Sequence, residues 1–150
     1  MSSALRLVLS SICAMAVTVF AGCAHSGATT GTDLDQLQGS WLPVTAELAG
    51  KPFPEQVRKT ISLTVEGDAY RVTVGPAVDK GTLHADRSAT PHTLDIVGTE
   101  GPNKGKTIPA IFERQGDTVR ICYDLSGGSR PTVFVSKEGT QLFLVTYKKQ

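Results

Sequence analysis

Strict alternation of apolar and polar residues is the feature that most constrains the fold of this chain. Ile61, Leu63 and Val65 alternate with polar residues, and the same pattern returns over residues 70–74. Residues 67–68, Gly-Asp, form a typical turn sequence between the two runs. A period of two fits a β-strand with one buried face and does not fit an amphipathic helix. The two runs therefore predict a β-hairpin.

The alternation continues along most of the chain after Leu37. Further strands are predicted near residues 40–48, 83–85, 94–96, 108–114, 118–123, 132–135 and 141–147. The expected inward face includes Trp41, Val44, Leu142 and Leu144. One helical turn or two are expected at residues 54–60, where Pro and Glu suit a helix start. A length of 150 residues suits one core, so we predict an all-β, antiparallel meander that closes into a barrel of about eight or nine strands.

The first 23 residues have the pattern of an export signal. Arg6 is the only charged residue before Asp33, and an apolar run over residues 7–21 follows it. A short basic start before a run of this length is typical of a secretory signal peptide and is short for a membrane span. We therefore predict a signal peptide over residues 1–22.

The end of that run, residues 20–23 (FAGC), resembles the lipobox of bacterial lipoproteins. The resemblance implies that Cys23 is lipidated and becomes the new N-terminus, so that acyl chains hold an exported protein at a membrane. Because Ala24 rather than Asp follows Cys23, it also implies the outer membrane, facing the periplasm, if the cell is Gram-negative. The alternative is a signal peptide cut elsewhere, with Cys23 unmodified. Residues 24–33 are small and polar with two glycines, and we predict a flexible tether over 23–36 before a domain over 37–150.

The cysteine count leaves one thiol in the domain. Cys13 leaves with the signal peptide and Cys23 takes the lipid, so Cys122 has no partner for an intramolecular disulfide. We expect Cys122 to be a small buried residue. A reactive Cys122 is the alternative, but it would need a partner histidine that no motif supplies.

Residues 39–41 (GSW) resemble the Gly-x-Trp element of lipocalins, in which the tryptophan plugs one end of an eight-stranded barrel. Three more segments follow in order: 101–107 (GPNKGKT), 116–123 (GDTVRICY) and 130–132 (RPT). Together they are similar to an uncharacterised lipocalin-like domain family of exported bacterial proteins, over about residues 37–147. The resemblance implies a lipocalin- or calycin-like barrel with Gly39 and Trp41 in structural roles. It implies no activity.

Catalysis, cofactors and nucleic acid find no support in the sequence. Residues 101–107 end in Gly-Lys-Thr, but a P-loop needs four residues between its glycines and this loop has three. His25, His84 and His92 do not have metal-ligand spacing, and a formal net charge of +1 offers no basic face for nucleic acid. We therefore predict a protein that is not an enzyme and has no cofactor or metal, with a hydrolase as the less favoured alternative.

A non-catalytic binding module is the remaining interpretation. The expected loops 98–106 and 125–130 carry Lys104, Lys106 and Arg130, cations that suit the acidic cleft of an exported enzyme. The leading hypothesis is therefore a protein partner, as in an inhibitor or immunity protein; the alternative for Arg130 is that it tethers its own loop. The second hypothesis is a small apolar ligand inside the barrel, although we favour a filled interior over a pocket.

Overall fold

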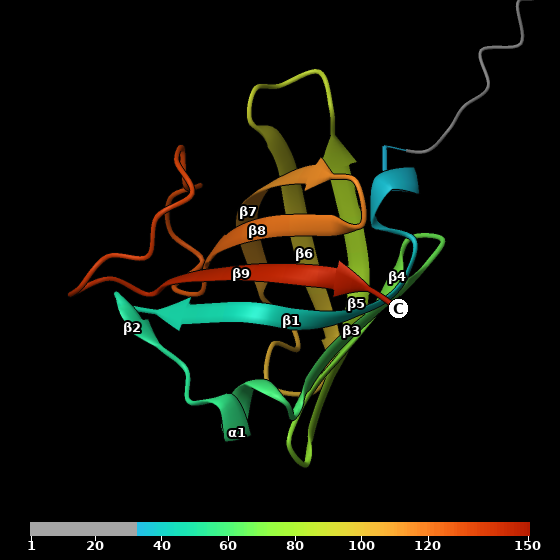
Figure 1. The fold of residues 1–150 in the computed structure, drawn as a ribbon. Coiled ribbons are helices and arrows are strands. Elements are labelled where there is room, and N and C mark those ends of the chain that lie inside the picture. The colour runs from blue at the N-terminus through green and yellow to red at the C-terminus, as the bar shows by residue number, and fades with distance from the viewer. Residues whose placement is uncertain (1–32) are drawn as a thin grey trace, which may run out of the picture. The chain divides into compact units, whose positions relative to one another are not determined.

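The computed structural model describes residues 33–150, so the predicted signal peptide, the lipidation site Cys23 and the first part of the predicted tether lie outside the described residues. Nine strands make up most of the described part (Figure 1). They are β1 (Gly39–Leu48), β2 (Lys51–Pro52), β3 (Ile61–Glu66), β4 (Ala69–Val74), β5 (Ala77–Asp86), β6 (His92–Glu100), β7 (Thr107–Gln115), β8 (Thr118–Asp124) and β9 (Leu142–Lys149). The 3-10 turn η1 (Asp35–Leu37) precedes β1, and the one-turn helix α1 (Glu55–Arg58) falls within the predicted helical segment. No helix among these residues is long and apolar enough to span a membrane.

The strands form one antiparallel sheet in the order β2-β1-β3-β4-β5-β6-β7-β8-β9. Strands β1 and β9 also pair, from Trp41 opposite Lys149 to Leu48 opposite Phe143. This pairing closes β1 and β3–β9 into an eight-stranded barrel, with β2 beside the end of β1 (Figure 1). The prediction of an all-β barrel from an antiparallel meander is confirmed.

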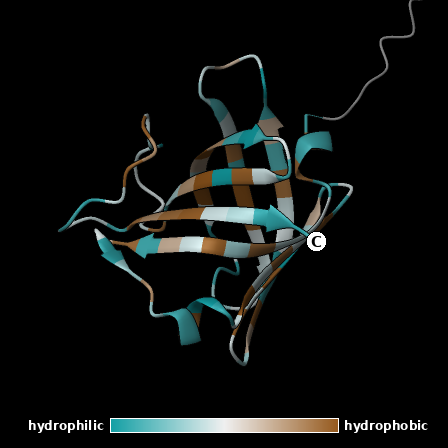
Figure 2. Cartoon of the chain, in the orientation of Figure 1, coloured by the Kyte–Doolittle hydropathy of each residue, from teal (hydrophilic) through white to brown (hydrophobic). Residues whose placement is uncertain are grey.

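The alternation that predicted the strands also separates the two faces of the barrel wall. Bands of hydrophobic and hydrophilic residues follow one another along the strands in Figure 2. In β3, Ile61, Leu63 and Val65 are buried in the core, and the polar residues between them are not. A single cluster of such residues fills much of the interior. Burial of apolar surface contributes roughly 25 cal/mol of stabilising free energy per Å². The burial of this cluster is therefore the main force that stabilises the barrel.

Three expected inward residues face outward. Val44 is 43% exposed because it lies three residues after the inward Trp41, and side chains alternate between the two faces of a strand. A β-bulge between Pro43 and Thr45 then shifts the alternation, so that Ala46 is the next buried residue of β1. In β9 the core residues are Phe143, Val145 and Tyr147, one position away from the predicted Leu142 and Leu144. Nearly every position from 142 to 147 is apolar, so alternation alone does not determine which face is buried.

The predicted strand at 132–135 does not form. Strands β8 and β9 already pair with each other and with β7 and β1, so the closed wall leaves no edge for residues 132–135 to join. The segment instead covers the outer face of the barrel, where the Cys122 thiol donates to the carbonyl oxygen of Val135 at 3.7 Å and Arg120 lies 4.3 Å from the ring centroid of Phe134. Cys122 is buried beneath it, as expected of a small apolar residue, and burial raises the pKa of its thiol.

Trp41 fills one end of the barrel, as the resemblance implied. Its side chain has no exposed area, and its indole nitrogen donates to the carbonyl oxygen of Leu37 at 2.7 Å. The ammonium of Lys149 lies 5.8 Å from the ring centroid, so Lys149 is the residue of the final strand beside Trp41. Gly39 has φ +107°, and a Cβ there would lie 3.1 Å from Cε of Lys149. Glycine therefore suits both the backbone and the close approach.

The predicted boundary between tether and domain, at 36/37, lies a few residues too late. Leu34 is buried in the core, and Arg114 donates from Nη1 to the carbonyl oxygen of Gln36 at 2.9 Å. Residues 34–36 therefore belong to the barrel domain. The small, polar composition of the preceding residues does not reveal this, because one apolar side chain is enough to pack the segment against the barrel end.

Candidate functional site

The barrel encloses a cavity of about 240 Å³. Every strand from β3 to β9 contributes a side chain to its wall, and most of these side chains are aliphatic. Leu37 lies at the end that Trp41 closes. The prediction of a barrel interior filled by side chains, without a pocket, is therefore wrong.

The opposite end of the barrel carries the rim of the cavity. Val74 at the end of β4 and Ala77 at the start of β5 line it there, together with Pro102 in the β6–β7 loop and Leu125 after β8. Val74 lines the cavity and is also 42% exposed. The cavity therefore meets the solvent at Val74.

One buried carboxylate lies in this apolar wall. Asp79 of β5 is 9% exposed and lines the cavity. Its Oδ2 accepts hydrogen bonds from the Tyr70 hydroxyl at 2.8 Å and from Nδ2 of Asn103 at 2.9 Å, and its Oδ1 accepts one from the Asn103 backbone nitrogen at 2.9 Å. None of the ion pairs formed within residues 33–150 includes Asp79. The carboxylate is therefore held by neutral donors alone.

Glycine positions bring these three residues together. Gly81 lies opposite Tyr70 across β4 and β5, and a Cβ at Gly81 would lie 2.8 Å from Cε1 of the tyrosine ring. Gly101 has φ +88°, and a Cβ there would lie 2.2 Å from the carbonyl oxygen of Val78. Only glycine allows the β6–β7 loop to lie this close to β5, and this approach brings Asn103 onto Asp79.

Two further tyrosines, Tyr123 and Tyr147, line the same cavity. Burial raises the pKa of Tyr147 to about 12, and burial together with the neighbouring Tyr147 hydroxyl raises the pKa of Tyr123 well above its usual value. Burial and the Asp79 carboxylate also raise the pKa of Tyr70. All three phenols therefore stay neutral at physiological pH, and Asp79 is the charged group among the residues that line the cavity.

The predicted contact residues have different surroundings. Lys104 and Lys106 are exposed on the β6–β7 loop. The side chain of Arg130, in the loop after β8, contacts β6 and β7. Its Nη1 donates to the carbonyl oxygens of Leu94 at 3.0 Å and Ala110 at 2.8 Å, and its Nη2 pairs with Asp95 at 2.6 Å. Arg130 thus tethers its own loop, which is the alternative that the sequence left open.

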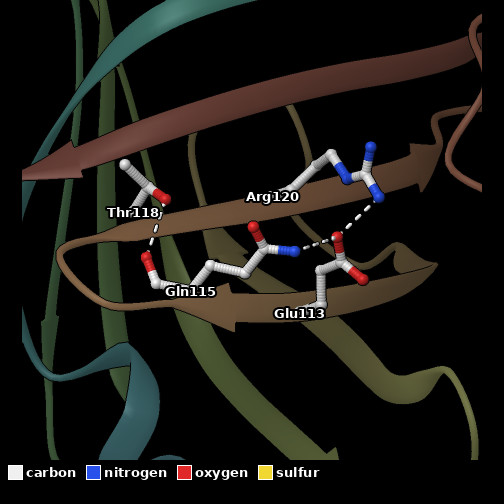
Figure 3. A network of polar contacts seen from close by, with 4 residues as sticks. All are labelled: Glu113, Gln115, Thr118 and Arg120. Atoms are coloured by element: carbon white, nitrogen blue, oxygen red, sulfur yellow. Dashed lines mark hydrogen bonds and ion pairs between the residues drawn. The ribbon is translucent and has the colours of Figure 1, made fainter.

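A second, polar hollow lies on the outer face of β7, β8 and β9. Arg120 pairs through Nη2 with Oε1 of Glu113 at 2.5 Å, and Nε2 of Gln115 lies 3.4 Å from the same oxygen (Figure 3). Because the guanidinium and the carboxylate neutralise each other, the hollow has no net charge to offer a ligand. Within the described part of the chain, no three His, Cys, Asp or Glu side chains are grouped so as to hold a metal ion.

Sequence reasoning missed Tyr70, Asp79 and Asn103 as site residues. The available signal was the position of Asp79, which shares the inward parity of Leu83 once β5 is extended back to Ala77. An acidic residue at an inward position indicates either a buried polar contact or a site. Comparisons of the chain with protein-family models, with curated proteins and with solved structures find no match. The residues of the cavity therefore carry the functional conclusion.

Proposed function

We propose that this protein is a non-catalytic binding module that takes up one small, mainly apolar molecule inside the barrel. The observation that supports this is the cavity of about 240 Å³ with aliphatic walls and a solvent-exposed rim at Val74. An apolar cavity of about 150 Å³ stays dry and binds benzene. By proportion, this cavity suits a ligand of about ten non-hydrogen atoms, smaller than those of the usual drug-sized pockets of roughly 300–1,000 Å³.

The hydrophobic effect supplies the affinity in this proposal. Transfer of a methylene group from water into an apolar site contributes about 0.8 kcal/mol. The strands already hold the cavity walls in place, so binding does not have to order a loop first. A ligand of this size fits through the rim only if the side chains near Val74 leave it open, so changes there will affect binding rates.

A pair of matched variants tests the proposal. Val72 lines the cavity and Val44 points away from the barrel, so Val72→Phe fills the cavity and Val44→Phe adds the same ring outside it. We expect calorimetric titration with butylbenzene to show one saturable site in the wild-type protein and in Val44→Phe, and at least about tenfold weaker binding in Val72→Phe. No binding to the wild-type protein, or equal binding to Val72→Phe, would overturn the proposal.

The proposal includes export and a lipid anchor at Cys23, supported by the apolar run and the FAGC segment of the sequence. Acyl chains would give membrane affinity without a basic patch, in keeping with the near-neutral net charge of +1. If the cell is Gram-negative, a barrel anchored in this way at the periplasmic face of the outer membrane would lie beside a bilayer, into which small apolar molecules partition.

The protein-partner hypothesis stays a prediction that depends on two residues. Lys104 and Lys106 are exposed on the rim loop and free to contact an acidic surface. The guanidinium of Arg130 is engaged with β6 and β7, so it contributes less to such a surface than the sequence suggested.

A further inference from the structure

We propose that the cavity selects amines: its ligand is a small apolar molecule with one protonated amino group placed against Asp79. This inference rests on the proposed function, since it assumes that a ligand enters the barrel. It adds the chemical class of that ligand and the residue that recognises it.

The first step is the charge of the site. A carboxylate removed from water is costly unless an opposite charge or several hydrogen bonds compensate it. Asp79 has three neutral donors, from Tyr70 and Asn103, and takes part in none of the ion pairs within residues 33–150. An ammonium group on the ligand would supply the missing positive charge.

The second step is the hydrogen-bonding capacity that is left. Oδ1 of Asp79 accepts one hydrogen bond, from the Asn103 backbone nitrogen, and so keeps a free lone pair. The Tyr70 hydroxyl donates its proton to Oδ2 of Asp79, which leaves its oxygen able to accept. The raised pKa of Tyr70 keeps this proton in place. The free positions at this point of the cavity are therefore acceptors.

The third step compares ligand groups. An ammonium has three donors and no acceptor, so it complements both the charge and the free acceptors beside Asp79. A hydroxyl offers one donor and no charge. A ligand carboxylate brings only acceptors and a second negative charge, which disfavours its binding. The expected order of affinity is amine, then alcohol, then hydrocarbon, with the carboxylate weakest.

The alternative is that Asp79 serves only as a latch for the β6–β7 loop. Asn103 belongs to that loop, and its two hydrogen bonds to Asp79 hold the loop against β5. A latch would stabilise the rim and would not distinguish one ligand from another of the same shape. Probes of nearly equal size and different end groups separate the two roles.

The test uses four probes built on one phenylalkyl skeleton: 3-phenylpropylamine, 3-phenylpropan-1-ol, butylbenzene and 3-phenylpropanoate. Titration of the wild-type protein should give an affinity for the amine at least about tenfold above that for the alcohol. Asp79→Asn keeps the side-chain shape and removes the charge, so it should abolish the preference for the amine and retain binding of butylbenzene. Glu100→Gln is the matched control, because Glu100 is an exposed carboxylate paired with Lys80, and it should keep the preference.

The outcomes separate this inference from the proposed function. Butylbenzene binding without a preference for the amine in the wild-type protein, or a preference that survives in Asp79→Asn, would overturn the inference alone. Failure of all four probes to bind would overturn both. If Asp79→Asn does not fold, nuclear Overhauser contacts in the complex of the wild-type protein with 3-phenylpropylamine test whether the amino group lies beside Asp79. The methylene next to nitrogen should contact the Tyr70 ring, and contact of the phenyl end there instead would overturn the inference.

Discussion

Asn103 holds Asp79 by two hydrogen bonds at once, since its backbone nitrogen and its side-chain amide each lie 2.9 Å from a carboxylate oxygen. Asn103 belongs to the β6–β7 loop and Asp79 to β5, so the pair fixes part of the open end of the barrel to its wall. The same carboxylate accepts the Tyr70 hydroxyl. The Asp79 carboxylate thus links the β6–β7 loop to β4 and β5 and also lines the cavity.

Asn103→Ala should lower the free energy of unfolding by about 1–2 kcal/mol. The change removes the side-chain hydrogen bond to a charged, buried acceptor, and such bonds contribute more than neutral ones. Urea denaturation measures the difference. Lys104→Ala in the same loop is the control and should stay within about 0.5 kcal/mol of the wild-type protein. Equal stability of the two variants would show that Asn103 does not hold the loop.

Trp41→Ala should cost about 3–5 kcal/mol, because the indole is completely buried and its removal leaves a large void at the barrel end. Thermal or urea unfolding gives the value. Leu42→Ala is a suitable control, since Leu42 is the next residue, on the opposite face, and 43% exposed. A loss below about 1 kcal/mol for Trp41→Ala would contradict its structural role.

Asp124 should make the stability depend on pH. The Ser126 hydroxyl donates to its Oδ1 at 2.6 Å, and this bond and backbone donors from the same loop hold the pKa of Asp124 below its usual value. A pKa lower in the folded state means that the stabilisation is present above the unfolded pKa of about 3.9 and is lost as the pH falls through the folded one.

Asp124→Asn should therefore destabilise the protein at pH 7, and the difference should shrink as the pH falls below about 4. Chemical denaturation across this range measures the effect. Asp117→Asn is the control, because Asp117 is exposed and its ion pair with Lys148 is long, at 3.6 Å. A pH-independent difference for Asp124→Asn would assign its effect to shape rather than to charge.

Arg130→Ala should lower stability by about 2 kcal/mol, because three hydrogen bonds from a charged donor to β6 and β7 are lost. The double change Lys104→Ala, Lys106→Ala should leave the melting temperature nearly unchanged, since both side chains are exposed. Calorimetry of the two variants gives the comparison. An unchanged melting temperature for Arg130→Ala would show that Arg130 does not stabilise the barrel, and would favour its predicted role in contacting a partner.

Cys23→Ser should release the protein from the membrane fraction, because serine offers no sulfur for the acyl chains that anchor a lipoprotein. Cell fractionation and the mass of the processed chain measure the outcome. Cys13→Ser, within the predicted signal peptide, serves as the matched control. Normal membrane association of Cys23→Ser would refute the anchor.

The barrel was predictable because alternation is a local signal. The hairpin of β3 and β4 follows from residues that lie within a few positions of one another. The bulge at Val44 and the packing of Phe134 outside the wall were not predictable, because both depend on contacts between distant segments. The bulge depends on how β9 lies against β1, and the position of Phe134 depends on Arg120 of β8. The cavity and the position of Asp79 depend on distances across the interior, which alternation does not contain.

The pairing of β1 with β9 also determines the order in which the fold can be completed. Trp41 and Lys149 lie opposite each other although almost the whole domain separates them along the chain. Contacts between such distant segments form slowly, because a long loop must close first. A chain that emerges from its N-terminus, in synthesis or in export, therefore exposes one side of β1 until its last residues arrive. Loss of those residues would leave an open sheet, and the Trp41 end of the barrel would lack its final strand.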